Sequence, residues 1–365
     1  MDILQAHLSP SQIIVDIMVI CMVLGALDHV FGNRFGLGTQ FLEGFAAFGS
    51  IAPTMTGVLV LVPLIGTYLA PLITPVCQAV GIDPAMFAGA LLACDMGGYP
   101  LAAEIAVDPQ AVGLSGMILS SMMGAAIVFN IPVSLGIIDA SDRPAMSKGV
   151  LCGFITIPVG CLAGGLTAGY DIGFLLVNLI PVLLISLIIC VCLKLFPDGI
   201  TKVFIIFGRI IGIVATLAAA LSIAEALTKI TIIPGLGSVY DAMDVLVSIV
   251  LVLPGAYVMV AIVSKLLKKP FDAAGKLLGI NDKSTLGLVT SLANAVPTFG
   301  LIKDMDERGK VLNFAFLVSA GYLLGDHLAF CSAMDTALVL PTLVGKLTGG
   351  ITAAAVALWM TRKVK

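Results

Sequence analysis

The stretch LLACDMGGYP, residues 91–100, decides the class of this protein. It begins as an apolar run, and it then places Asp95, Gly97, Gly98 and Pro100 where a buried helix would carry apolar side chains. The whole chain of 365 residues is 59% hydrophobic and 11% charged, with a mean hydropathy of +1.12. Soluble domains carry about 25% charged residues. The chain is therefore an integral membrane protein, and the stretch puts a carboxylate and helix breakers at membrane depth.

The composition also excludes several classes of protein. The net charge is −3 and the basic residues are scattered, so no nucleic-acid partner is indicated. The three histidines and eight cysteines show no metal-ligand spacing, and the cysteines lie almost entirely in apolar runs, as small packing residues do. No Walker loop, nucleophile elbow or zinc-protease motif is present. We therefore expect no cofactor, no metal and no enzymatic activity.

Apolar runs bounded by charge, glycine and proline divide the chain into eleven segments, each near the roughly 20 residues that a spanning helix needs. They are 12–31, 44–70, 84–105, 112–137, 148–169, 173–195, 203–228, 241–267, 283–302, 311–331 and 336–360. The sequence thus predicts an all-α polytopic membrane protein formed by one domain over residues 1–365.

The basic residues indicate that two segments do not cross the bilayer. The connections 70–84 and 106–111, on either side of the third segment, contain no Lys or Arg. The connections around the ninth segment contain eight: Lys265, Lys268, Lys269, Lys276, Lys283, Lys303, Arg308 and Lys310. Cytoplasmic loops are enriched in Lys and Arg. We therefore predict re-entrant hairpins over 84–105 and 283–302 and about nine crossings.

With the N-terminus outside, this topology places 16 of the 19 basic residues on the cytoplasmic side, including Lys363 and Lys365 at a cytoplasmic C-terminus. With eleven crossings no orientation fits as well.

The chain also resembles itself. GIDPAMFAGALLACDM, from Gly81, is similar to GINDKSTLGLVTSLAN, from Gly279, and SSMMGAAIVF at 120–129 is similar to GYLLGDHLAF at 321–330. Gly89 then faces Gly287, and Gly124 faces Gly325. An odd number of predicted crossings separates the counterparts, so the repeats are expected to be inverted, as in many secondary transporters.

The repeat predicts a division of the chain. Residues 44–169 form the first repeat, 170–240 a connecting scaffold, and 241–360 the second repeat.

The hairpin tips are expected to meet near the middle of the bilayer. Gly97, Gly98 and Pro100 interrupt the third segment, and Asn294 and Pro297 interrupt the ninth. Irregular backbone at this depth is tolerated where it lines a cavity or is buried in protein.

Polar residues gather around these tips in the sequence. The candidate substrate-binding residues are Asp95, Asp326, His327, Asn130, Asn294 and Tyr322. Asn130 precedes Pro132 at an expected helix break, and Tyr322 is expected one turn before Asp326 on the same helix face. We expect no Lys or Arg inside the bilayer near these residues, so that the carboxylates favour a small cation with hydrogen-bonding groups.

Structural roles for these residues remain open. Asp95 could cap a hairpin helix, and Asp326 with His327 could form a structural pair or a proton relay. The two asparagines could satisfy broken backbone, and Tyr322 could serve packing alone.

These same motifs resemble a known family. LLACDMGGYPLAAEI, SSMMGAAIVFNIPVSLGII, SLANAVPTFG and LLGDHLAF are similar to the ethanolamine permease (EutH) family of bacterial ethanolamine-utilisation operons, and the likeness covers nearly the whole chain. The resemblance implies uptake of ethanolamine through the bacterial inner membrane for a cytoplasmic lyase. Ethanolamine is protonated at neutral pH, as lysine is.

We expect an elevator-like, alternating-access permease in the lipid bilayer, and a monomer and a homo-oligomer both remain open. An ethanolamine channel, an ion-coupled carrier for another small cationic metabolite and an intramembrane enzyme are the alternatives.

Overall fold

The computed structural model describes residues 9–362, without the side chains of Ser50, Pro197 and Asp198. It is 86% helical, and the described residues contain no strand. The predicted all-α class is confirmed, whereas Lys363, Lys365 and the first eight residues lie outside the described part. The long helices are α2 (Pro10–Val30), α3 (Leu37–Ala79), α8 (Arg143–Thr167), α9 (Ile172–Leu195), α10 (Pro197–Thr228), α11 (Val239–Leu278) and α16 (Val339–Met360).

A further long helix is formed by consecutive elements whose turns are mostly wider than those of an α-helix. These are α6 (Pro109–Ala111), the π-helical η2 (Val112–Gly124) and η3 (Ala126–Asn130), and α7 (Ile131–Ile137). Within residues 9–362, eight helices are long and apolar enough to cross a membrane. The chain is a multi-pass membrane protein.

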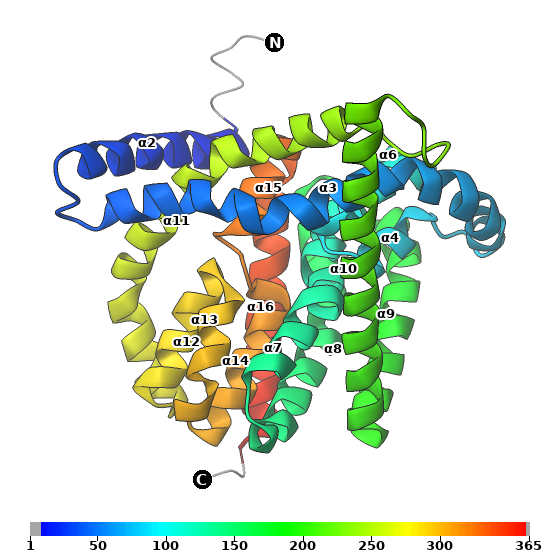
Figure 1. Ribbon diagram of the computed structural model, residues 1–365. Coiled ribbons are helices and arrows are strands. Elements are labelled where there is room, and N and C mark those ends of the chain that lie inside the picture. The colour runs from blue at the N-terminus through cyan, green and yellow to red at the C-terminus, as the bar shows by residue number, and fades with distance from the viewer. Residues whose placement is uncertain (1–8, 363–365) are drawn as a thin grey trace.

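The long helices run in two main directions. In Figure 1, α2, α3 and the first part of α11 lie across the top, whereas α8, α9, α10 and α16 run downward. Helices α8 and α16 pack closely, since a side chain at Gly160 or Gly164 would meet backbone atoms of α16. Small residues allow such close helix contacts in membrane proteins. This contact brings α16 against the centre of the molecule.

The predicted hairpin 84–105 is a broken element whose two ends meet. It consists of α4 (Ala85–Leu91), the short turn η1 (Cys94–Met96) and α5 (Gly98–Ile105). Asp83 accepts hydrogen bonds from the amides of Val107 and Asp108, at 3.0 and 2.8 Å, so both ends of the element lie at one place.

The predicted hairpin 283–302 has the same construction. Helices α12 (Asp282–Ala293) and α13 (Ala295–Leu301) are separated by Asn294, and η5 (Ile302–Asp304) follows. The Asn281 amide donates to Asp306 Oδ1 at 2.8 Å, and its side chain donates to the Asp304 carbonyl at 3.0 Å. In Figure 1, α4 lies on the right, and α12 lies lower and on the left. That each enters the bilayer from its own side stays a prediction.

The tenth segment is not one helix. It contains α14 (Glu307–Ala320) and α15 (Asp326–Met334), and Tyr322 between them has a φ of 59°. The expectation that Tyr322 and Asp326 share a helix face is therefore wrong. The turn forms because α12 ends beside it: the amides of Tyr322 and Leu324 donate at 2.9 Å to the carbonyls of Ser291 and Leu292, which the end of α12 leaves unpaired.

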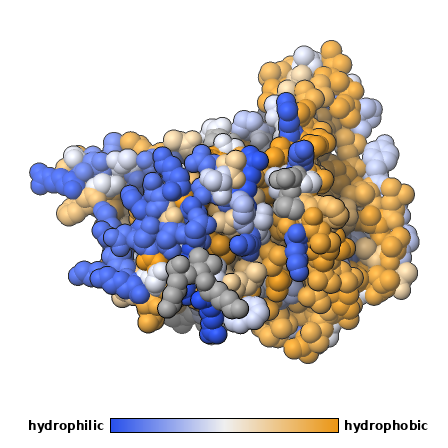
Figure 2. Space-filling model, turned by 90° about the horizontal axis from the view of Figure 1, so that it is seen from below, coloured by the Kyte–Doolittle hydropathy of each residue, from blue (hydrophilic) through white to orange (hydrophobic). Residues whose placement is uncertain are grey.

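The surface seen from below is divided. Figure 2 shows hydrophilic residues over one side of this face and apolar residues over the other. The end of α11 and the second hairpin lie low in Figure 1 and carry exposed lysines, namely Lys268, Lys269, Lys276, Lys283 and Lys303. Nearby, Lys310 of α14 binds Asp142, ahead of α8, at 2.7 Å. This is the side that the charge pattern predicts to be cytoplasmic.

Candidate functional site

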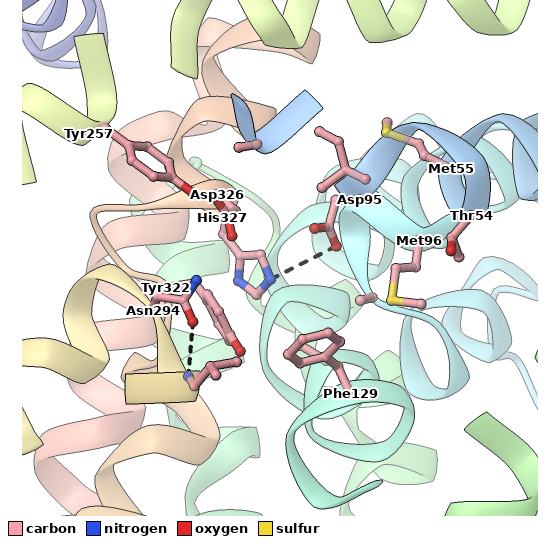
Figure 3. A pocket seen from close by; sticks show the side chains of 15 residues that line it. Thr54, Met55, Asp95, Met96, Phe129, Tyr257, Asn294, Tyr322, Asp326 and His327 are labelled. Atoms are coloured by element: carbon pink, nitrogen blue, oxygen red, sulfur yellow. Dashed lines mark hydrogen bonds and ion pairs between the residues drawn. The ribbon is translucent and has the colours of Figure 1, made fainter. Parts of the chain in front are cut away.

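A cavity of about 320 Å³ lies where the broken ends of both hairpins approach α3, α11 and α15. Figure 3 shows its lining side chains. They are Ala47, Ile51, Thr54, Met55, Ala93, Asp95, Met96, Ala125, Phe129, Tyr257, Asn294, Val296, Tyr322, Asp326 and His327. Most of this lining is apolar, and two carboxylates face a common space.

Five of the six predicted binding residues line this cavity: Asp95, Asn294, Tyr322, Asp326 and His327. The sixth, Asn130, is buried in the wide-turned helix and does not line it. Asn130 also has ordinary right-handed helical dihedrals, so the expected backbone break before Pro132 is wrong. The helix continues because its wider turns accommodate the proline.

The predicted tip residues do not line the cavity, and they shape the backbone beside it. Gly97 has a φ of +95°, and a side chain there would collide with Val58 of α3. Gly98 begins α5, and its amide donates to the Ala93 carbonyl. Pro100 and Pro297 lie in the first turns of α5 and α13, where a proline costs no helical hydrogen bond.

The two carboxylates have different partners. Tyr257 Oη donates to Asp326 Oδ1 at 3.1 Å, and Asp95 Oδ1 lies 4.0 Å from Nε2 of His327. Asp326 and His327 are neighbours in the chain but contact different groups. Asp95 is not the cap of α5, since that cap is Gly97 and has no side-chain hydrogen bond. The Asp95 side chain is 24% exposed, and it faces the cavity.

Asn294 combines a structural contact with a place in the lining. Its Oδ1 accepts the Val296 amide at 2.9 Å and so caps α13. Aromatic rings form another wall: the Tyr322 ring lies 5.0 Å from the His327 ring and 6.0 Å from that of Phe129. Rings at a cavity wall can bind an ammonium through its attraction to their π-face.

A buried lysine lies directly behind this lining. Lys346 of α16 is 1% exposed, and its Nζ lies 3.0 Å from Nδ1 of His327 and 2.6 Å from the Ser121 carbonyl. The expectation that no basic residue inside the bilayer lies near the site is therefore wrong. The sequence assigns Lys346 to the last segment but does not show which way its side chain points.

Three possible metal ligands also lie at this corner. Ligand atoms of Cys94, Asp95 and His327 are within 4.8 Å of one another. The Lys346 ammonium beside His327 opposes a divalent cation electrostatically, whereas a singly charged guest in the cavity has Asp95 and Asp326 to face it. The arrangement thus suits an organic cation better than a metal ion.

Similarity to known proteins identifies the family of this chain. The family model described as "Ethanolamine utilisation protein, EutH" matches residues 11–360. The chain belongs to the EutH family. Two relatives named as probable ethanolamine permeases are similar to it: one from Listeria monocytogenes is 46% identical over 98% of this chain and 96% of the relative. The other, from Salmonella typhimurium, is 42% identical over 97% and 96%.

A third relative, named only as an uncharacterised protein, comes from Bacillus subtilis and is 44% identical over 96% of this chain and 95% of the relative. No solved structure matches this chain. The names above describe the relatives.

Proposed function

We propose that this protein carries ethanolamine across the bacterial inner membrane and is a transporter rather than an enzyme. The observation that carries the proposal is the cavity at the hairpin breaks, with Asp95 on one side and Asp326 on the other. A carboxylate inside a membrane protein is costly unless it has a partner or water. A guest ammonium between the two would supply that partner.

The proposed pose uses the contacts around each carboxylate. Asp326 already accepts one hydrogen bond from Tyr257, and Asp95 has His327 on one side at 4.0 Å. The ammonium would bind between Asp95 and Asp326, near the rings of Phe129 and Tyr322. The ethanolamine hydroxyl would then point to Asn294, whose side chain lies on the same wall.

Alternating access is the proposed mode of transport. The two hairpins would move with their adjoining helices against α2, α9 and α10. Both hairpins are broken, and each has its ends held together by hydrogen bonds, so each can move as a unit. A crosslink between hairpin and scaffold is expected to stop transport; transport through a fully crosslinked protein would exclude this motion.

Uptake of labelled ethanolamine into proteoliposomes tests the proposed function. A carrier is expected to show saturable uptake and counterflow, in which unlabelled ethanolamine inside the vesicles accelerates entry of label. Asp95→Asn should abolish saturable uptake while the protein still inserts in the membrane. Flux that does not saturate and shows no counterflow would establish a channel instead, and unchanged uptake by Asp95→Asn would remove Asp95 from the site.

A further inference from the structure

Ethanolamine binding alone does not explain why Lys346 is buried behind the cavity. Its amine does not line the cavity, yet it lies inside the protein at the end of a short series of contacts that leads there. Burying a lysine in this way is costly unless its charge is paired and hydrogen-bonded. Among the residues that the structure describes, Lys346 Nζ forms hydrogen bonds only with the Ser121 carbonyl and His327.

His327 links this amine to the cavity. A lysine ammonium is a donor only, so Nδ1 of His327 accepts from Lys346, and the ring hydrogen of a neutral imidazole is then on Nε2. Nε2 is the atom that faces Asp95 Oδ1 at 4.0 Å. The order of groups is an ammonium, a neutral ring and a carboxylate, so one positive charge lies a single imidazole away from Asp95.

The cavity is surrounded by more negative than positive charge. Two carboxylates line it, Asp95 and Asp326, and Lys346 is the buried cation behind them. Glu43 of α3 is exposed and lines a different, open hollow. The empty site therefore has one unmatched negative charge. Net charge in a buried site is unfavourable, because low-dielectric surroundings strengthen electrostatic interactions.

We propose that Lys346 determines specificity by matching one of the two carboxylate charges, so that the empty site keeps one net negative charge and accepts organic monocations. This inference rests on the proposed function and narrows its substrate class. A guest with one ammonium and no carboxylate neutralises the site. A diamine with two ammonium groups leaves an excess positive charge, and an amino acid zwitterion leaves the negative charge unmatched.

Binding to purified protein tests this charge count, with ethanolamine and 1,3-diaminopropane compared by isothermal titration calorimetry. The wild type should prefer ethanolamine. Lys346→Met adds a second unmatched negative charge, so its preference for ethanolamine over the diamine should fall by about tenfold or more. Lys346→Arg, which keeps the charge, is the control and should retain the preference.

A charge-compensating pair keeps the test decisive if Lys346→Met alone does not fold. Asp326→Asn makes the site neutral and should weaken ethanolamine binding. Adding Lys346→Met to Asp326→Asn restores one negative charge, so the double variant should bind ethanolamine more tightly than Asp326→Asn. A double variant that binds no more tightly than Asp326→Asn overturns the proposal. A wild-type protein that binds no ethanolamine would instead overturn the proposed function.

Discussion

In the first hairpin the backbone breaks between α4 and α5, and the break carries Asp95; in the second, the break between α12 and α13 is Asn294. Each hairpin has its ends held together by an aspartate, Asp83 in the first and Asp306 in the second. The construction is the same while the tip residues differ in charge. The shared contacts therefore set the geometry of the site, and the difference supplies its chemistry.

The glycines show how far the likeness extends. A side chain at Gly89 would collide with Ser115 of the following helix, and one at Gly287 would collide with Asn313 of α14, at the equivalent place. Likewise Gly124 lies against the Leu92 carbonyl of the first tip, and Gly325 lies against that of Ala293 at the second. The same kind of contact thus recurs at both breaks, and the duplication and its inversion across the membrane stay predictions.

Substitutions at the two hairpin tips should have the largest effect, and they test whether the charge of Asp95 is what binds ethanolamine. Asp95→Asn gives both tips an amide, and it should weaken ethanolamine binding by about 100-fold or more, because removing one partner of a buried charge pair costs roughly 3–5 kcal/mol. Asn294→Asp still lets the side chain cap α13 and removes neither carboxylate, so it should keep ethanolamine binding. The negative charge that it adds should lower the preference for ethanolamine over 1,3-diaminopropane, as Lys346→Met does. Calorimetry on both variants checks this; equal losses would show that the two tips do not differ in role.

Adding a methyl group at the two equivalent glycines should lower the stability of the protein, an effect smaller than the loss of binding above. Gly89→Ala should destabilise the protein by roughly 1–3 kcal/mol through overpacking, because the added methyl meets the Ser115 backbone carbonyl. Gly287→Ala should cost less, because the nearest atoms belong to the side chains of Asn313 and Met305 rather than to backbone, and the end of the flexible Met305 side chain can move. Thermal unfolding in detergent compares the pair. A larger loss for Gly287→Ala would contradict this account of the packing.

The hydrogen bonds at the base of the second hairpin predict a dependence on pH. Burial acts to raise the pKa of Asp306, but hydrogen bonds from the Asn281 amide, the Ser284 hydroxyl and the Gly309 amide hold that pKa below its ordinary value. A lowered folded-state pKa stabilises the protein above the unfolded pKa of about 4, and this stabilisation is lost as the pH falls through the folded-state value.

Asp306→Asn should therefore unfold at a lower temperature than the wild type at pH 7, and the difference should shrink below about pH 4. Asp304→Asn, at an exposed neighbour, removes the same charge and is the control. A constant difference between wild type and Asp306→Asn across this range would show that the Asp306 carboxylate is not held as described.

The sequence predicts the two backbone breaks for a physical reason, whereas the re-entrant course of these elements stays a prediction. Asp95, Gly97 and Asn294 interrupt apolar runs, and polar or flexible residues at such depth are costly unless the backbone breaks there. The turn at 321–325 has no such signal in the sequence. Its letters GYLLG continue an apolar run, and the turn depends on pairing with the end of α12, far away in the chain.

Lys346 and Tyr257 also could not be placed from the sequence. Both lie on long helices, and which helix face points to the cavity depends on packing against partners distant in the chain. Lys346 contacts Ser121, and Tyr257 contacts Asp326. A local pattern does not specify such contacts, although a lone lysine within an apolar helix marks a residue that needs a buried partner.

The central claim is that the two hairpins open to opposite sides of the membrane and meet at the cavity. Single cysteines at exposed positions flanking each hairpin test it, with the half-buried native Cys77 and Cys192 replaced by serine. The positions are Val80→Cys and Val107→Cys for the first hairpin and Lys283→Cys and Lys303→Cys for the second. In intact cells, a membrane-impermeant maleimide should label both members of the first pair and neither member of the second. In inside-out membrane vesicles, it should label both members of the second pair. Members of one pair reacting from different sides would contradict the account.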